Sequence, residues 1–114
     1  MAKTKKKTYK AISLKQPWAN LVASGKKTIE TRKWKTNHRG TIVICSSQKP
    51  SIAPAGYALC TAELYHIEPM KKEHEEKACI KLYPGAFSWF LKNIKPFKNP
   101  IPVKGKLSIF TLKL

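Results

Sequence analysis

Acidic residues are scarce in this sequence. The 114 residues include no aspartate and only six glutamates, against 23 lysines and arginines, so the formal net charge is +17. Like charge crowded onto so small a chain opposes folding by self-repulsion, whereas contact with phosphates relieves the repulsion and releases condensed counterions. The scarcity of acids therefore predicts a polyanionic partner, and nucleic acid is the simplest one.

The few acidic residues are also unevenly placed. Residues 1–50 carry 13 basic side chains and a single acid, Glu30, and residues 77–114 carry eight basic side chains and no acid. The other glutamates all lie within residues 51–76. Both flanking stretches can therefore contribute to a basic surface.

Long apolar runs, basic amphipathic helices and lipidation signals are all missing, so membrane attachment is not expected. The lysine-rich start of the chain is followed by no apolar core of a signal peptide. These absences predict an intracellular protein of the cytoplasm.

Cysteine pairs are missing as well. Cys45, Cys60 and Cys79 are odd in number and widely spaced, with no CxxC pair. Neither a disulfide framework nor a metal site is indicated, and no cofactor is expected. The three thiols are predicted to be reduced and mostly buried.

One domain is expected, because 114 residues that are 42% hydrophobic can fill one core but not two. We expect residues 9–114 to form this domain, as a monomer, and residues 1–8 to form a basic, flexible tail. The tail could grip phosphates or only improve solubility, and both readings remain open.

The hydrophobic pattern predicts a mainly β, α+β architecture. Strands are expected over residues 9–14, 28–34, 41–45, 57–67, 87–94 and 107–112. The apolar spacing of Trp18, Leu21 and Val22 predicts a short helix that ends near Ser24, and residues 70–79 are also expected to be helical. Pro96, Pro100 and Pro102 indicate an extended connection. About five or six strands with short flanking helices favour a small β-barrel.

The segment after Gly25 carries the main functional signal. Glycine permits a sharp turn there, which would bring Lys26 and Lys27 to the start of the strand expected over 28–34. Side chains alternate along a strand, so Glu30 and Arg32 project from one face. A cation, a carboxylate and a guanidinium can therefore converge near Lys27.

Several spaced motifs resemble the activating signal cointegrator homology (ASCH) domain family of the PUA-like superfamily. The strongest are SLKQPWA at residues 13–19, GKKTIETRKW at 25–34 and HRG at 38–40, and YPGA at 83–86 and PVKGKL at 102–107 follow in the same order. The resemblance covers nearly the whole chain. It implies a PUA-like β-barrel with short helices and a cleft that takes a base or nucleotide.

The residue types in these motifs suit a nucleotide. Arg32 and Arg39 offer bidentate donors, and Glu30 can accept from an exocyclic amine or hold Arg32 in place. Trp18 lies on the apolar helix face and is typical of core, whereas Trp34 stands between two lysines and is the better candidate for contact. The predicted nucleic-acid-binding set is Lys15, Gln16, Trp18, Lys26, Lys27, Glu30, Arg32, Trp34, Arg39 and Lys104.

Three functions are compatible with the sequence. The first is a module that binds RNA, single-stranded or modified. The resemblance also implies a second, a ribonuclease or a small hydrolase of N4-acetylcytidine, in which Lys27 and Glu30 would be catalytic; a lysine matches Lys27 in those amidohydrolases, but a threonine stands where this chain has Glu30. The third is a transcription-coactivator-type module that binds an acidic protein. We expect a binding module rather than an enzyme.

Overall fold

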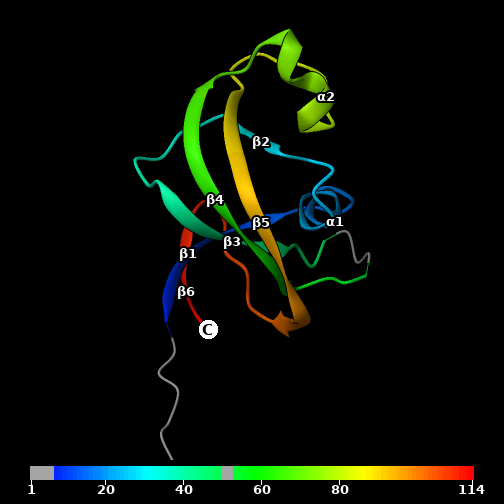
Figure 1. Ribbon diagram of the computed structural model, residues 1–114, viewed down its shortest axis with the longest axis vertical. Coiled ribbons are helices and arrows are strands. Elements are labelled where there is room, and N and C mark those ends of the chain that lie inside the picture. Colours follow the sequence, from blue (N-terminus) through cyan, green and yellow to red (C-terminus); the bar gives the residue numbers. More distant parts are fainter. Residues whose placement is uncertain (1–6, 50–52) are drawn as a thin grey trace, which may run out of the picture.

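The computed structural model describes residues 7–49 and 53–114 and consists of one six-stranded sheet with two short α-helices (Figure 1). The helices are α1 (Trp18–Ala23) and α2 (Glu75–Ala78), and a 3-10 turn, η1 (Lys72–His74), precedes α2. The strands are β1 (Thr8–Leu14), β2 (Ile29–Arg32), β3 (Gly40–Ser46), β4 (Tyr57–Pro69), β5 (Phe87–Pro102) and β6 (Phe110–Lys113). The mainly β fold class is confirmed.

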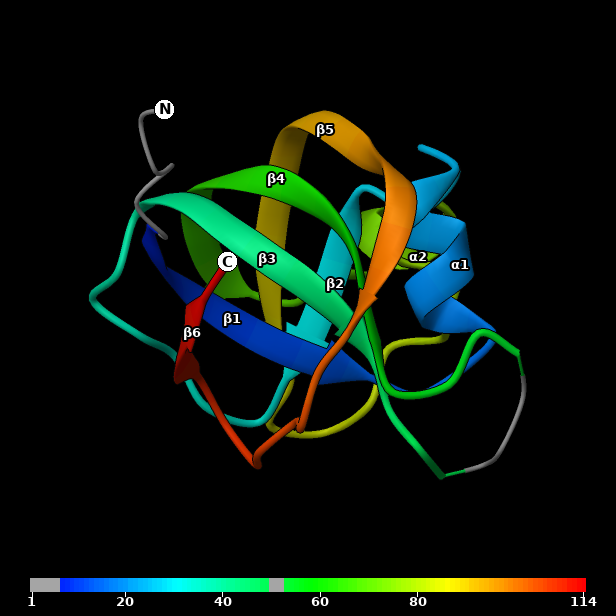
Figure 2. The ribbon, with the colours of Figure 1, turned by 90° about the horizontal axis from the view of Figure 1, so that it is seen from below.

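The sheet is a curled half-barrel. Its strand order is β2-β5-β4-β3-β1-β6, in which only β1 and β3 are parallel and the other neighbours are antiparallel. Figure 2 shows the sheet curling so that β2, at one edge, comes round toward β1 near the other edge. This curl positions the candidate site described below.

The apolar run at residues 41–45 forms the centre of the core, as predicted. Ile42, Val43 and Ile44 of β3 are fully buried, and β4 and β1 flank them. The apolar face of α1 packs on the same core through Ala19 and Val22. The helix therefore closes over one side of the curled sheet because its apolar stripe is buried there.

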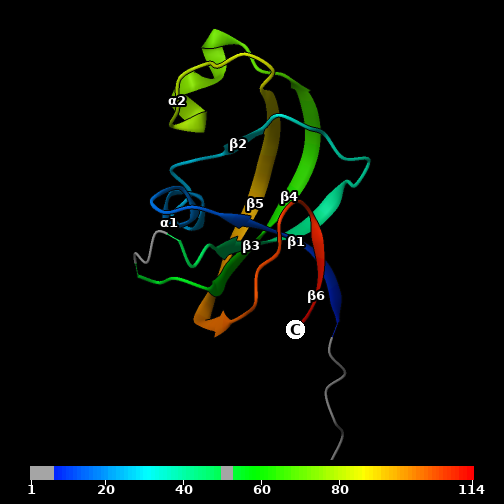
Figure 3. The ribbon, with the colours of Figure 1, turned by 180° about the vertical axis from the view of Figure 1, so that it is seen from behind.

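The helices lie on one side of the molecule (Figure 3). Helix α1 ends as predicted, with Ser24 as its C-cap and Gly25 in the left-handed region at φ +83°. The helix expected over residues 70–79 is shorter than predicted and comprises only η1 and α2. No helix of the described chain is long and apolar enough to cross a membrane.

The connection predicted around three prolines is wrong, because β5 continues through Pro102 as one strand. Strand β2 pairs with β5 only from Phe87 to Phe90. Beyond Phe90 that edge of β5 has no pairing with β2, so the missing N–H of a proline costs no ladder hydrogen bond there. The irregular register between β4 and β5 accommodates the prolines on the other edge.

Two strands are shorter than predicted. The last one begins at Phe110 rather than at residue 107, because Ser108 has φ +55° and cannot continue an extended strand. The strand expected over residues 28–34 spans only Ile29–Arg32. Most of the tail expected over residues 1–8 lies outside the described residues, and β1 starts at Thr8.

The cysteines are free thiols, as predicted. Cys45 and Cys60 are fully buried in the sheet, and Cys79 is partly exposed. Burial in apolar surroundings disfavours the thiolate and raises the pKa of Cys45 and of Cys60 from 9.0 to about 12.

These two thiols should make the fold sensitive to alkali. The unfolded chain releases each thiol proton from about pH 9, while the folded protein holds it until about pH 12. Stability therefore falls as the pH rises through this window, by up to about 1.4 kcal/mol per thiol per pH unit. Urea unfolding of wild type and Cys60→Ala at pH 8, 9 and 10 measures the effect. The stability of wild type relative to the variant should decline above pH 9, and a constant difference would contradict the assignment.

Candidate functional site

A cleft of about 630 Å³ lies where the half-barrel remains open. Its walls include β2, at one edge of the sheet, and the end of β1, the last strand but one toward the other edge. It is lined by Ser13, Leu14, Lys15, Trp18, Lys27, Glu30, Thr31, Arg32, Ser46, Ser47, Gln48, Ile80, Tyr83 and Gly105 to Ser108. The volume is within the usual range for small-molecule sites.

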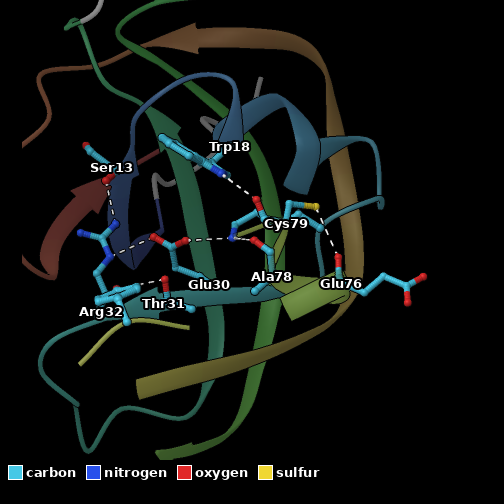
Figure 4. Close-up of polar contacts among 10 residues, drawn as sticks. Ser13, Trp18, Glu30, Thr31, Arg32, Glu76, Ala78 and Cys79 are labelled. Atoms are coloured by element: carbon cyan, nitrogen blue, oxygen red, sulfur yellow. Dashed lines mark hydrogen bonds and ion pairs between the residues drawn. The ribbon is translucent and has the colours of Figure 1, made fainter. Parts of the chain in front are cut away.

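Two cations and one carboxylate form a continuous chain of contacts across this opening (Figure 4). One carboxylate oxygen of Glu30, Oε1, lies 3.5 Å from the Lys27 ammonium, and Oε2 accepts a hydrogen bond of 3.0 Å from Arg32 Nε. Arg32 Nη2 then donates to the backbone carbonyl of Ser13 at 2.8 Å. A side chain of β2 thereby reaches β1, so a charged hydrogen-bond donor joins strands that do not pair.

The other end of this chain of contacts is the last turn of α2. The Lys27 ammonium donates to the carbonyl oxygen of Ala78, the last residue of the helix. Carbonyls in a last helical turn lack intrahelical partners and carry partial negative charge, so they suit a cation. Trp18 Nε1 donates to the next carbonyl, that of Cys79, at 3.4 Å. The short helix α2 therefore holds both the lysine and one aromatic wall of the cleft.

The backbone around Lys27 is fixed from two sides. After the turn at Gly25, the Lys27 N–H donates to the carbonyl of Leu21 in α1 at 3.0 Å. The next N–H, that of Thr28, donates to the carbonyl of Lys77 in α2 at 2.9 Å. These bonds direct the Lys27 side chain inward, where it is only 1% exposed.

Burial lowers the pKa of Lys27 below its ordinary value of 10.5. Desolvation of the ammonium is the main cause, and the Glu30 carboxylate opposes it by favouring the charged form. Glu30 is itself buried, so its charge acts on Lys27 with little screening from water. The protonation of Lys27 is therefore set by burial, which disfavours the ammonium, and chiefly by Glu30, which favours it.

Aromatic side chains wall the cleft on two sides. Trp18 is half-buried at the start of α1, and its ring is fixed by the bond to Cys79. Tyr83 follows α2 and donates its hydroxyl to Thr31 Oγ1 of β2 at 3.1 Å. Both rings are therefore held in place before any ligand arrives.

The loop between β5 and β6 forms the remaining edge of the cleft. Gly105 passes so close to Ser13 that a Cβ at this glycine would lie 2.4 Å from the Ser13 hydroxyl oxygen. A side chain at position 105 would therefore require either the Ser13 hydroxyl or the loop to shift. Two residues further on, Leu107 is 95% exposed beside the cleft.

Five of the ten predicted site residues line the cleft, namely Lys15, Trp18, Lys27, Glu30 and Arg32. The other five do not, namely Gln16, Lys26, Trp34, Arg39 and Lys104. Lys26 and Lys104 are exposed on the surface outside the cleft.

Three of the residues outside the cleft have structural contacts instead. Gln16 is buried and bridges the carbonyl of Pro54 and the N–H of Asn20. Trp34 packs edge-on against the buried Trp89, with ring centroids 4.9 Å apart. Arg39 donates to the carbonyls of Thr36 and His38 in its own turn. Trp18, rather than Trp34, is the tryptophan at the cleft.

Sequence reasoning missed several lining residues. Tyr83 belongs to the YPGA motif, which could have suggested it, and Lys106 lies in the PVKGKL motif beside the chosen Lys104. Ser13 is the first residue of the SLKQPWA motif, and its hydroxyl is buried with no hydrogen-bond partner among the described residues. No periodic pattern in the sequence marks Ser46, Ser47 or Gln48.

The curled six-stranded half-barrel with two short helices matches the ASCH/PUA-like fold. The comparison with known families is more specific, since the ASCH domain matches residues 12–101. The chain therefore belongs to the ASCH domain family. The crystal structure of ASCH from Zymomonas mobilis is similar in fold, with a TM-score of 0.73 and 19% identity, over 91% of this chain and 87% of that chain.

Two curated proteins are similar in sequence. Activating signal cointegrator 1 of Mus musculus is 26% identical over 126 aligned residues, which cover 89% of this chain and 22% of that protein. Activating signal cointegrator 1 of Homo sapiens is 44% identical over 41 residues, 35% of this chain and 7% of that protein. The chain thus matches about a fifth of the length of the mouse protein and less of the human one.

The ionic contacts predict an asymmetric response to mutation. Glu30→Gln leaves a buried ammonium without its carboxylate and should lower the free energy of unfolding by about 3 to 5 kcal/mol. Lys27→Met should cost less, because Glu30 keeps Arg32 as a partner. Adding Lys27→Met to Glu30→Gln should recover part of the loss, as measured by urea unfolding at pH 7. Additive losses in the double variant would contradict the pairing.

The stability of the Glu30→Gln variant should also depend on pH. Without the Glu30 carboxylate, the pKa of Lys27 falls further below 10.5, so the folded protein sheds this proton at a lower pH than the unfolded chain does. The unfolded state then binds more protons, and stability rises with pH. Because the Glu30 carboxylate lets wild type hold the Lys27 proton to a higher pH, the deficit of Glu30→Gln relative to wild type should shrink as the pH rises toward 10.5.

Proposed function

We propose that this protein binds RNA and holds one unstacked nucleotide of a single strand in the cleft of the open half-barrel. The observation that carries the proposal is the convergence of Lys27, Glu30 and Arg32 at one opening. Two cations against one carboxylate leave this opening positive. A nucleotide offers the phosphate and the hydrogen-bonding base edge that such a cleft can recognise.

Donors for the ligand come from Arg32 and from the rim. A guanidinium carries five N–H donors, and the hydrogen bonds within the described residues use its Nε and Nη2. The remaining donors can serve a phosphate or a base edge in the bidentate manner of arginine. Lys15 and Lys106 are exposed at the rim, where their flexible ammonium groups suit the strand's phosphates.

The walls support a base rather than a simple anion. Trp18 and Tyr83 offer aromatic surfaces, and stacking of a base on such a ring is worth about 1 to 3 kcal/mol. Glu30 can accept a hydrogen bond from an exocyclic amine only where an oxygen lone pair is left by Lys27 and Arg32. Its first effect is to orient those two cations, so the base is held mainly by stacking and by Arg32.

Affinity for single-stranded RNA should fall steeply with salt, because each neutralised phosphate contributes about 0.7 to the slope of log affinity against log salt. Lys15→Ala and Lys106→Ala should each reduce the slope by about that amount. Lys113→Ala, which removes an exposed charge from β6 outside the cleft, is the matched control and should leave the slope nearly unchanged. The measurement is a fluorescence titration of labelled oligonucleotides between 50 and 300 mM salt.

Two outcomes would overturn the proposal. One is the absence of binding at the lowest salt concentration. The other is equal competition by poly-glutamate of matched charge, which would favour the acidic-protein partner over RNA.

A second candidate function rests on Lys27 alone. Its pKa is lowered by burial, and it lines a cleft of nucleotide size, so it can lose its proton and act as a base or nucleophile toward a modified base. Hydrolysis of N4-acetylcytidine would break the bond between the acetyl carbon and N4 and release acetate and cytidine. The hydrogen bond to Ala78 and the ion pair with Glu30 oppose this role, because both stabilise the protonated amine.

Incubation with N4-acetylcytidine tests this second function. If it holds, chromatography should detect released cytidine with wild type and none with Lys27→Met, at a rate that increases with pH as Lys27 loses its proton. Arg39→Ala is a suitable control, since Arg39 lies outside the cleft. The absence of turnover by wild type would rule this function out and leave RNA binding intact.

We further propose that the protein acts as a monomer in the cytoplasm. Its three free thiols suit a reducing compartment, and single-stranded RNA is available there.

A further inference from the structure

A second depression, of about 570 Å³, lies next to the cleft. It is formed by the end of β4, the segment between α2 and β5, and the first residue of β5. Its lining residues are Pro69, Met70, Leu82, Tyr83, Pro84, Gly85, Ala86 and Phe87. None of them is charged, so this groove differs in chemistry from the ionic cleft beside it.

Tyr83 lines both depressions and is therefore their common wall. Its hydroxyl is fixed to Thr31 on the side of the cleft, at 3.1 Å. The backbone of the groove is fixed as well. The Met70 N–H donates to the carbonyl oxygen of Ala86 at 2.9 Å, and the Ala86 N–H donates to the carbonyl oxygen of Tyr83 at 3.3 Å. The groove is thus preformed and adjoins the cleft at Tyr83.

The groove offers a surface on which a flat, apolar-faced group can lie. Leu82 is 46% exposed, and the ring of Phe87 and the prolines form its neighbours. Covering such surface removes apolar area from water. Cations stand close by: Lys35 Nζ lies 5.6 Å from the centroid of the Phe87 ring, and the exposed Lys81 directly precedes Leu82.

We infer that this groove binds the base adjacent to the one in the cleft, so that two successive nucleotides of one RNA strand lie on either side of Tyr83. The inference rests on the proposed function and specifies its ligand as at least a dinucleotide. Continuity through Tyr83 favours a neighbouring base over an unrelated apolar partner. The nearby lysines favour it too, because a phosphodiester must pass between the two positions.

The test separates the second base from the second phosphate. Affinities are measured for RNA dinucleotides with a 5′ phosphate and for the same molecules with either nucleotide made abasic, which keeps the charge constant. All four homodinucleotides are used, because the base preference is not assumed. Stacking in both positions predicts that removal of either base weakens binding by about 5- to 150-fold.

A matched pair of variants locates the effect. Leu82→Ser alters the groove, and Tyr65→Ser alters a side chain of β4 that is equally exposed, at 45%, but lines neither depression. The gain in affinity that one of the two bases provides over its abasic counterpart should shrink severalfold in Leu82→Ser and persist in Tyr65→Ser. Because both side chains are half exposed, neither change is expected to unfold the protein, and thermal melts check this.

The outcomes distinguish the inference from the proposed function. If removal of one of the bases changes nothing in wild type, the groove does not hold a base, although RNA binding by the cleft stands. If the gain in affinity from each of the two bases is unchanged in Leu82→Ser, the second base lies elsewhere and the inference is overturned. If neither the dinucleotides nor longer RNA bind, the proposed function fails and the inference fails with it.

Discussion

The buried ion pair between Lys27 and Glu30, extended by Arg32, is the constraint on which the site depends. A half-barrel that does not close by strand pairing must hold its open edges by other means, and here the series of contacts runs from the carbonyl of Ala78 to that of Ser13. Both ends of the series are neutral backbone oxygens. The series of contacts therefore carries a net positive charge. The same contacts hold the two sides of the opening together and make the opening positively charged.

This arrangement joins stability to function. A buried ammonium is costly unless it is paired, so the fold tolerates Lys27 only while Glu30 and α2 stay in place. Helix α2 has four residues and would be marginal alone, yet its last carbonyls hold Lys27 and Trp18. The contacts that hold the cleft wall are consequently the same ones that support α2. A change to one of them affects both the cleft and the helix.

The sequence predicts the parts of the site that are local and misses those that depend on distant contacts. Strand alternation after Gly25 places Glu30 and Arg32 on one face, and in the structure these two side chains form an ion pair. Alternation predicts on which side of a strand a residue lies, but not what its side chain contacts. It therefore could not show that Trp34 packs on Trp89 while Trp18 lines the cleft. Tyr83 donates a hydrogen bond to Thr31, 52 residues away in the sequence, and hydrophobic periodicity cannot predict such a contact. The course of β5 was missed for a similar reason, since the tolerance of its prolines depends on where β2 stops pairing.

The pairing of β1 with β6 has a practical consequence. Lys7 and Leu114 exchange two backbone hydrogen bonds, of 2.9 and 3.0 Å, at the far ends of these adjacent strands. In a variant trimmed to residues 7–114, a short linker could join these positions and make the backbone circular, and new ends could be opened in the exposed turn around Asn37, which lines neither depression. A circularly permuted protein of this kind would carry a label or fusion partner at Asn37 while the order of strands in the sheet stayed the same.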